Sequence, residues 1–184
     1  MTGLVLAHSN LLLQALERVP KSLEVRVLFS AHGLPKSIVR AGDPYVWQVE
    51  QTASAVASAT GLNNDQWRLC YQSKVTPVEW VGPSTDEEIV TAGDDGVAVV
   101  LVPIAFVSEH SETLVELDIE YADLAKRVGV TAYERVPALG EAPAFINGLR
   151  EVVVAALNQK SDQRWTCSAK GSRSCPNEHS GCPM

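Results

Sequence analysis

The amino-acid sequence predicts an α/β fold in which a four-stranded parallel sheet carries helices on both faces. Short apolar segments of strand length alternate along the chain with longer segments whose apolar residues recur at helical spacing. The connections between them are short, which favours parallel strands joined by right-handed crossovers. The most regular strand-like segment, residues 97–102, reads V-A-V-V-L-V between Gly96 and Pro103. An uninterrupted apolar run is typical of a strand that is buried on both faces.

The first part of the chain contains two predicted helices and two predicted strands. Apolar spacing predicts a first helix that ends at Pro20, and a strand at about residues 24–30 follows it. The turn signal at residues 42–44 predicts the start of a second helix, which runs until Gly61 ends it. The second strand is expected at residues 67–72. A long loop rich in proline and glycine leads from there to the second part.

The second part continues the alternation of helix and strand. Thr85 and Glu88 form a capping-box pattern, which predicts the start of the next helix. The third strand is followed by an acidic helix that ends with two basic residues, in the sense that complements the helix dipole. A fourth strand is expected at residues 132–136 and a last helix at residues 143–157.

Length and composition limit the organisation of the chain. Its 184 residues are enough for one domain with its own core. We expect a first helix and linker over residues 1–23, an α/β domain over residues 24–158 and a cysteine-containing tail over residues 159–184. The net charge of −7 argues against a nucleic-acid partner. No apolar run is long enough to span a bilayer, and the start lacks a basic export signal, so we expect a cytoplasmic location.

Ionisable side chains directly follow two of the predicted strands. His32 comes after the first strand, and His110 and Glu112 come after the third. Ligands bind outside the carboxyl ends of the strands in open α/β sheets, so these side chains are expected to face one crevice. Such a cluster makes metal or proton chemistry about as good an interpretation as a structural one. For either histidine alone, the more ordinary interpretation is a hydrogen-bonded structural imidazole.

The segment after His110 carries carboxylates at Glu112, Glu116 and Glu120, each four residues from the next. That spacing places them on one face of a helix, where like charges repel each other. A path for a cation would explain the arrangement, and a solvated acidic surface is the alternative. The sequence contains neither a G-x-G-x-x-G motif nor a Walker A motif, so we do not expect nucleotide binding by those devices.

Four sequence motifs follow one another between residues 25 and 121: V-L-F-S-A-H-G-L-P, G-D-P-Y, Q-S-K-V-T-P-V-E-W-V-G-P-S-T-D and V-P-I-A-F-V-S-E-H-S-E-T-L-V-E-L-D-I-E-Y. In this order and spacing they resemble the carboxyl-terminal half of the protoporphyrin ferrochelatases, and the resemblance covers about residues 25–157. That family inserts Fe²⁺ into protoporphyrin IX, the last step of haem synthesis. The resemblance implies a chelatase-type fold of two similar Rossmann-like halves around a porphyrin cleft, in agreement with the predicted sheet.

The resemblance also implies roles for individual residues of these motifs. His32 resembles the family's active-site histidine, which is assigned to proton abstraction from the pyrroles or to metal delivery. Glu112 is similar to the carboxylate opposite that histidine, and His110 is similar to its neighbour in the proton or metal network. Glu116 and Glu120 resemble an acidic metal path along a helix that is π-bulged in the family. The implied metal set is therefore His32, Glu112, Glu116 and Glu120.

Three further residues are implied as the lining of the porphyrin pocket. Trp80 and Phe106 resemble pocket-lining aromatic residues, and Ser30 is a weaker candidate from the same motif as His32. Aromatic rings stack on a flat macrocycle, and an imidazole that titrates near neutrality accepts a proton from it. Ordinary packing is the alternative for each aromatic side chain.

The chain departs from the family in length, because ferrochelatases are about twice as long as its 184 residues. The resemblance implies that the amino-terminal half is missing, so a fragment and one half of a split enzyme both remain open. The expected partners are protoporphyrin IX, ferrous iron, and the missing half or a second copy. Contact with the inner membrane would come through the missing half. The alternative function is a non-catalytic half that binds metal or tetrapyrrole only with a partner chain, and coproporphyrin III stays open as the porphyrin.

Three of the four cysteines lie in the last eighteen residues: Cys167, Cys175 and Cys182. Without an export signal a metal or cluster site is a better interpretation than disulfides. The segment resembles the extension that carries a [2Fe–2S] cluster in some ferrochelatases, and thiolates are the expected ligands. A disordered tail is one alternative, and a small electron carrier is another, argued from the tail alone. Cys70 lies within a predicted strand and is expected to be a core thiol.

Overall fold

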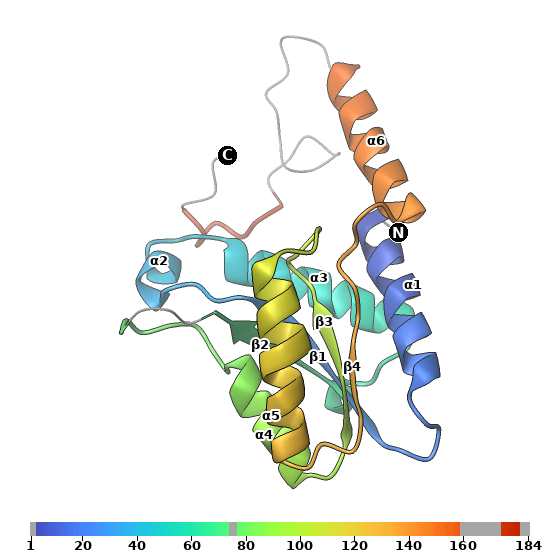
Figure 1. Cartoon of the computed structure of the whole chain (residues 1–184). Helices are drawn as coiled ribbons and strands as arrows, with labels where there is room; N and C mark the ends of the chain where they lie inside the picture. The colour runs from blue at the N-terminus through green and yellow to red at the C-terminus, as the bar shows by residue number, and fades with distance from the viewer. Residues whose placement is uncertain (1–2, 74–76, 159–173, 181–184) are drawn as a thin grey trace.

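The computed structural model describes residues 3–73, 77–158 and 174–180. At its centre is a four-stranded sheet in the order β2-β1-β3-β4 (Figure 1). The strands are β1 (Val25–His32), β2 (Trp67–Gln72), β3 (Ala98–Pro103) and β4 (Tyr133–Arg135). All three strand pairings are parallel, so the predicted fold class is confirmed. The strand β4 is shorter than the sequence predicts and pairs only with β3.

Helices connect the strands and extend the chain at both ends. They are α1 (Gly3–Arg18), α2 (Lys36–Arg40), α3 (Tyr45–Thr60), the short 3₁₀ helix η1 (Asn64–Gln66), α4 (Thr85–Asp94), the π-helix η2 (Glu112–Glu120), α5 (Tyr121–Arg127) and α6 (Pro143–Leu157). The sequence analysis missed α2 and η1, because five and three residues are too few to show a helical period.

The sheet separates two apolar cores, because successive side chains of a strand point to opposite faces. Val27 and Phe29 belong to the core that α1 and α3 cover, whereas Leu28 lies in the core that α4 and α5 cover. Figure 1 shows these two helical layers on either side of the sheet. By the same alternation Ser30 and His32 lie on the face that α4 and η2 cover. The candidate site therefore lies on that face of the sheet.

The helix α4 begins one residue away from the predicted capping box. Ser84 is the N-cap, and its backbone N–H donates to the Glu87 carboxylate at 2.8 Å. The predicted pair, Thr85 and Glu88, is wrong because Thr85 already lies inside the helix and has no exposed surface. Its hydroxyl instead lies 2.8 Å from the Ser30 hydroxyl beneath the site.

The acidic segment forms a π-helix and not an α-helix. Such a helix is wound with bonds from residue i to i+5, so side chains five positions apart come together. Accordingly the Tyr121 hydroxyl donates to Glu116 at 2.8 Å, five residues earlier. The structure thus contains the π geometry that the resemblance implies, and it carries Glu112 at its first position.

The last helix, α6, touches the rest of the molecule mainly near its start. Gly148 crosses α1 at Gly3 so closely that a Cβ atom on Gly148 would lie 2.9 Å from the Gly3 Cα. Beyond that crossing α6 extends away from the body (Figure 1). Its exposed apolar side chains include Leu149, Val152, Val153 and Leu157, the last with 79% exposure. Among the described residues no helix has the length and apolar character to cross a membrane.

Candidate metal and porphyrin site

A cavity of about 530 Å³ lies at the carboxyl end of β1, beside the π-helix. Its lining consists of His32, Ser73, Ser111, Glu112, Val115, Glu116 and Glu120. The strand register explains this composition, because His32 ends β1 opposite Gln72, which ends β2. The cavity therefore lies where ligands bind in open parallel sheets. The carboxylates of Glu112, Glu116 and Glu120 all line it.

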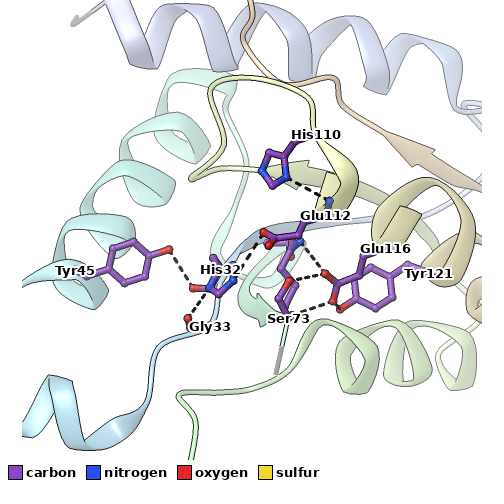
Figure 2. Close-up of polar contacts among 10 residues, drawn as sticks. His32, Gly33, Tyr45, Ser73, His110, Glu112, Glu116 and Tyr121 are labelled. Atoms are coloured by element: carbon purple, nitrogen blue, oxygen red, sulfur yellow. Dashed lines mark hydrogen bonds and ion pairs between the residues drawn. The ribbon is translucent and has the colours of Figure 1, made fainter. Parts of the chain in front are cut away.

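His32 presents one ring nitrogen to the cavity. Its Nδ1 lies 2.7 Å from the Gly33 carbonyl oxygen, which accepts only, so Nδ1 carries the hydrogen. The other nitrogen, Nε2, faces Glu112 Oε2 at 3.8 Å (Figure 2). The two side chains are 42% and 45% exposed, so an arriving ligand reaches both.

The backbone of His32 is fixed from the opposite side. The Tyr45 hydroxyl donates to the His32 carbonyl at 3.0 Å (Figure 2). Burial raises the pKa of Tyr45, and the bond to the carbonyl opposes this only in part, so the phenol stays a neutral donor. The sequence analysis missed Tyr45, although it belongs to the G-D-P-Y motif that carries the resemblance.

His110 lies behind Glu112 and not in the cavity lining. Its Nδ1 accepts a hydrogen bond from the Glu112 backbone N–H at 3.3 Å. Its ring contacts the Phe106 ring, with centroids 5.1 Å apart. The Thr113 hydroxyl donates to the His110 carbonyl at 2.9 Å and so closes the turn that starts the π-helix. His110 thus positions the start of η2 in this conformation.

Glu116 differs from Glu112 because its carboxylate is fully engaged. Oε1 accepts from the Ser73 backbone N–H at 2.9 Å and from the Tyr121 hydroxyl at 2.8 Å. Oε2 accepts from the Ser73 hydroxyl and from Gln72 Nε2, the latter at 3.3 Å. Ser73 adopts a positive φ of 63°, which aims both of its donors at this carboxylate (Figure 2). Burial together with Glu116 raises the pKa of Tyr121 far above its usual value, so the phenol remains a donor.

Arg135 at the end of β4 anchors the π-helix and the loop before it. Its guanidinium binds Asp118 through two nitrogens, each 2.6 Å from an oxygen, and it also binds Glu109. The Glu109 carboxylate accepts from the Ala138 backbone N–H at 2.8 Å as well. Burial acts to raise the pKa of Glu109, but these hydrogen bonds outweigh it and hold the pKa below its usual value.

Ser30, Phe106 and Trp80, the three predicted pocket residues, lie outside the cavity lining. Ser30 has no exposed surface and Phe106 is 8% exposed, so both are buried in this structure. Trp80 is half-buried and packs over Gly33, where an added Cβ atom would lie 3.2 Å from the indole ring. The residues of the cavity that the sequence analysis missed are Ser73, Ser111 and Val115. Each lies within one of the four motifs, but position in a chain does not reveal which side chains face a cavity.

Within the described ranges no cluster of three or more His, Cys, Asp or Glu side chains is placed to hold a metal ion. His32 and Glu112 form a pair, Glu116 is occupied by its donors, and Glu120 is exposed at the cavity edge. The pair supplies one imidazole and one carboxylate.

The cysteines give a partial test of the predicted cluster ligands. Cys167 and Cys182 lie outside the described residues. Cys175 is buried against α3, where Gln48 Nε2 lies 3.5 Å from its sulfur, and the rings of Trp47 and His179 lie near each other. Burial raises the pKa of Cys70 to about 12, which makes it a core thiol and a poor thiolate ligand. A single available thiol among the described residues does not form a cluster site.

The fold and the cavity define a parallel α/β protein with an imidazole–carboxylate pair at the carboxyl ends of its strands. The chain belongs to the ferrochelatase family: a sequence model of that family, described as Ferrochelatase, matches residues 2–157. Two similar proteins are the ferrochelatases of Caulobacter vibrioides (strain NA1000 / CB15N), 49% identical over 95% of this chain, and of Hyphomonas neptunium (strain ATCC 15444), 46% identical over 98%. The match covers 51% and 49% of those two proteins, so the chain spans about half their length.

The fold is also similar to a solved structure described as SirB from Bacillus subtilis with Fe³⁺. The TM-score is 0.58 at 20% sequence identity, over 85% of this chain and 56% of the other. At that identity the likeness concerns the fold alone. It agrees with the parallel sheet and its helical layers.

Proposed function

We propose that this chain is one half of a ferrochelatase, and that its site takes part in inserting Fe²⁺ into protoporphyrin IX to form protohaem. The observation that carries the proposal is the pair of His32 Nε2 and Glu112 Oε2, 3.8 Å apart on an accessible cavity. The membership of the family supplies the reaction. A divalent ion bound about 2.1 Å from each atom fits between a nitrogen and an oxygen at that separation.

The residues suit the steps that metallation requires. Two pyrrole N–H bonds break, the porphyrin nitrogens bind the ion, and the iron stays ferrous throughout. His32 accepts one proton at Nε2, because Nδ1 already carries a hydrogen for Gly33. The Glu112 carboxylate holds the partly dehydrated cation and accepts the second proton, which then passes to water. Glu120 lines the same cavity and is the carboxylate that the cation meets first on its way to His32 and Glu112.

The proposal requires a second wall for the porphyrin. The chain spans about half the length of its relatives, and its own cavity has a single sheet behind it. A macrocycle held on one side only is neither oriented nor shielded from water. We propose that the part of the enzyme corresponding to the family's amino-terminal half supplies this second wall. The alternative, a half that binds metal or tetrapyrrole without turnover, is distinguished by activity in the assembled pair.

The proposal extends to a [2Fe–2S] cluster on Cys167, Cys175 and Cys182, supported by the position of all three in the last eighteen residues and by the resemblance. The contact of Cys175 with Gln48 of α3 agrees with a segment, residues 174–180, that packs on the domain. Of the three proposed ligands only Cys175 lies within the described residues. Anaerobic reconstitution followed by visible absorption tests it, and unchanged absorption in a Cys175→Ala variant would remove that residue as a ligand.

The test of the metallation site is His32→Ala in an assembly of the chain with an amino-terminal half. Zinc insertion into a soluble porphyrin, followed by fluorescence, should fall at least about a hundredfold, because the general base contributes about that much. Arg40→Met is the matched control, since Arg40 is exposed on α2 and pairs with Glu79 away from the cavity. Retention of most of the control's rate by His32→Ala would remove His32 from the catalytic role.

A further inference from the structure

Behind the cavity lies a row of buried polar side chains that the proposed reaction does not use. Ser30, Gln72 and Thr85 have exposed fractions of 0%, 1% and 0%. Ser30 Oγ lies 2.8 Å from Gln72 Oε1 and 2.8 Å from Thr85 Oγ1. Gln72 Nε2 in turn reaches Glu116 Oε2 at 3.3 Å. Polar groups are costly to bury, so a connected row that ends on a carboxylate of the cavity calls for a function.

The hydrogen bonds of this row run in one direction. An amide oxygen only accepts, so Ser30 must donate to Gln72 Oε1. Having given its single hydrogen, Ser30 accepts from Thr85 at 2.8 Å, and the Thr85 hydroxyl also lies 3.4 Å from the Cys70 sulfur. The carboxamide is thereby held with Nε2 toward Glu116, and the opposite orientation would set Oε1 against the carboxylate. The buried row therefore fixes which end of Gln72 faces the site.

The donors around Glu116 match the capacity of its carboxylate. A carboxylate offers about four lone-pair sites on its two oxygens. In this structure Gln72, the two donors of Ser73, and Tyr121 occupy them. By contrast Glu112 accepts no hydrogen bond from a side chain in the described ranges apart from its contact with His32. A cation that binds Glu116 has to displace one of the four donors.

We infer that Gln72 is a positioning residue, which together with Ser30 and Thr85 keeps Glu116 a fixed hydrogen-bond acceptor and so withholds it from the metal. The inference rests on the proposed function. It assigns different roles to the carboxylates of Glu112 and Glu116. Glu112 is the carboxylate that binds the ion, while Glu116 joins the end of β2 to the π-helix through hydrogen bonds. Withholding Glu116 keeps the ion weakly held at His32 and Glu112, from which it passes to the porphyrin.

The test measures Co²⁺ binding to the whole chain by calorimetry, without porphyrin or turnover. Gln72→Met keeps the side-chain volume and removes the donor, so Glu116 gains a free lone pair. We expect Co²⁺ to bind about tenfold tighter, the size of effect that outer hydrogen-bond partners have on metal sites. The gain should vanish in the double variant Gln72→Met/Glu116→Gln. If Gln72→Met only disturbed core packing, Co²⁺ binding would not become tighter.

Cys70→Ala is the matched control, because Cys70 is buried beside Thr85 but is not in the cavity lining, and within the described ranges no hydrogen bond joins it to Gln72. It should lower the unfolding midpoint and leave Co²⁺ affinity unchanged. Equal or weaker affinity in Gln72→Met, or a gain that persists without Glu116, overturns the inference.

A second measurement separates the inference from the proposed function. Unfolding midpoints of Gln72→Met, Glu116→Gln and the double variant should be non-additive, since one hydrogen bond joins the two side chains. Additive shifts overturn the positioning role. If His32→Ala binds Co²⁺ as tightly as the wild type, the metal role of the pair fails, while the double-mutant cycle still decides the role of Gln72.

Discussion

At the scale of single residues, the tautomer of His32 determines what the site offers. The hydrogen on Nδ1 serves the Gly33 carbonyl, so Nε2 is left as an acceptor toward the cavity. The carboxylates also differ from each other: Glu116 is fully hydrogen-bonded, whereas Glu112, within the described ranges, accepts no side-chain hydrogen bond and faces only His32. The regular four-residue spacing therefore does not reveal that Glu112 and Glu116 have different surroundings.

Glu112 and Glu120 should respond differently to loss of charge. Glu112 faces His32 at 3.8 Å, whereas Glu120 is eight residues further along and exposed at the edge of the cavity. In the assembled enzyme we expect Glu112→Gln to lower zinc insertion by about a hundredfold or more and Glu120→Gln by less than about tenfold. Equal losses in both variants would contradict a graded path and indicate a common effect on stability.

His8 on α1 should make the stability of the chain depend on pH. It is 1% exposed, and burial lowers its pKa from 6.5 to about 4. In the unfolded chain it binds a proton below pH 6.5, while the folded form stays neutral until about pH 4. The unfolding free energy therefore falls as the pH drops through this window, by about 3 kcal/mol in total.

Denaturant unfolding at several pH values checks this expectation. His8→Leu should lack the part of the pH dependence that His8 contributes above pH 4, whereas the exposed His110→Gln should retain it. A wild-type profile that parallels the His8→Leu profile would show that His8 is protonated in the folded state.

At the scale of secondary-structure elements, the π-helix depends on its anchor in β4. Arg135 joins Asp118 of η2 to Glu109 of the preceding loop, and its side chain is 14% exposed. Arg135→Met leaves two partly buried carboxylates without their cation, so we expect a loss of about 2 kcal/mol in unfolding free energy. Arg40→Met, which breaks an exposed and solvent-screened pair, should cost clearly less than Arg135→Met. Similar losses in the two variants, measured by urea unfolding, would contradict the anchoring role.

The sequence predicts the elements better than it predicts the contacts between them. Apolar runs and stop signals locate all four strands. The cavity lining includes His32, Glu112, Glu116 and Glu120 but not His110, which the sequence also places after the third strand. The π winding follows only from the resemblance, because a four-residue spacing of carboxylates fits an α-helix equally well. Ser30 could not be placed from its motif, since burial depends on Thr85 and Gln72, which come from distant parts of the chain.

At the scale of the whole molecule, apolar surface remains uncovered. Phe106, one of the implied pocket-lining residues, is buried, and the larger set of exposed apolar side chains lies along α6. Leu114, Val115 and Ile119 of the π-helix are also about half exposed, beside the cavity. Exposed apolar surface of this extent commonly marks an interface. It agrees with a chain that covers half the length of its relatives.

The central claim is that this chain supplies the metallating half of a two-part site. The most direct measurement is zinc insertion into a soluble porphyrin by the chain, by the separately produced amino-terminal half of the Caulobacter vibrioides relative, and by their mixture. We expect the chain to fold, as circular dichroism would show, and to be nearly inactive alone. The mixture should be active, and its activity should disappear with His32→Ala in this chain. Full activity from the chain alone, or an active mixture that carries His32→Ala, would contradict the account.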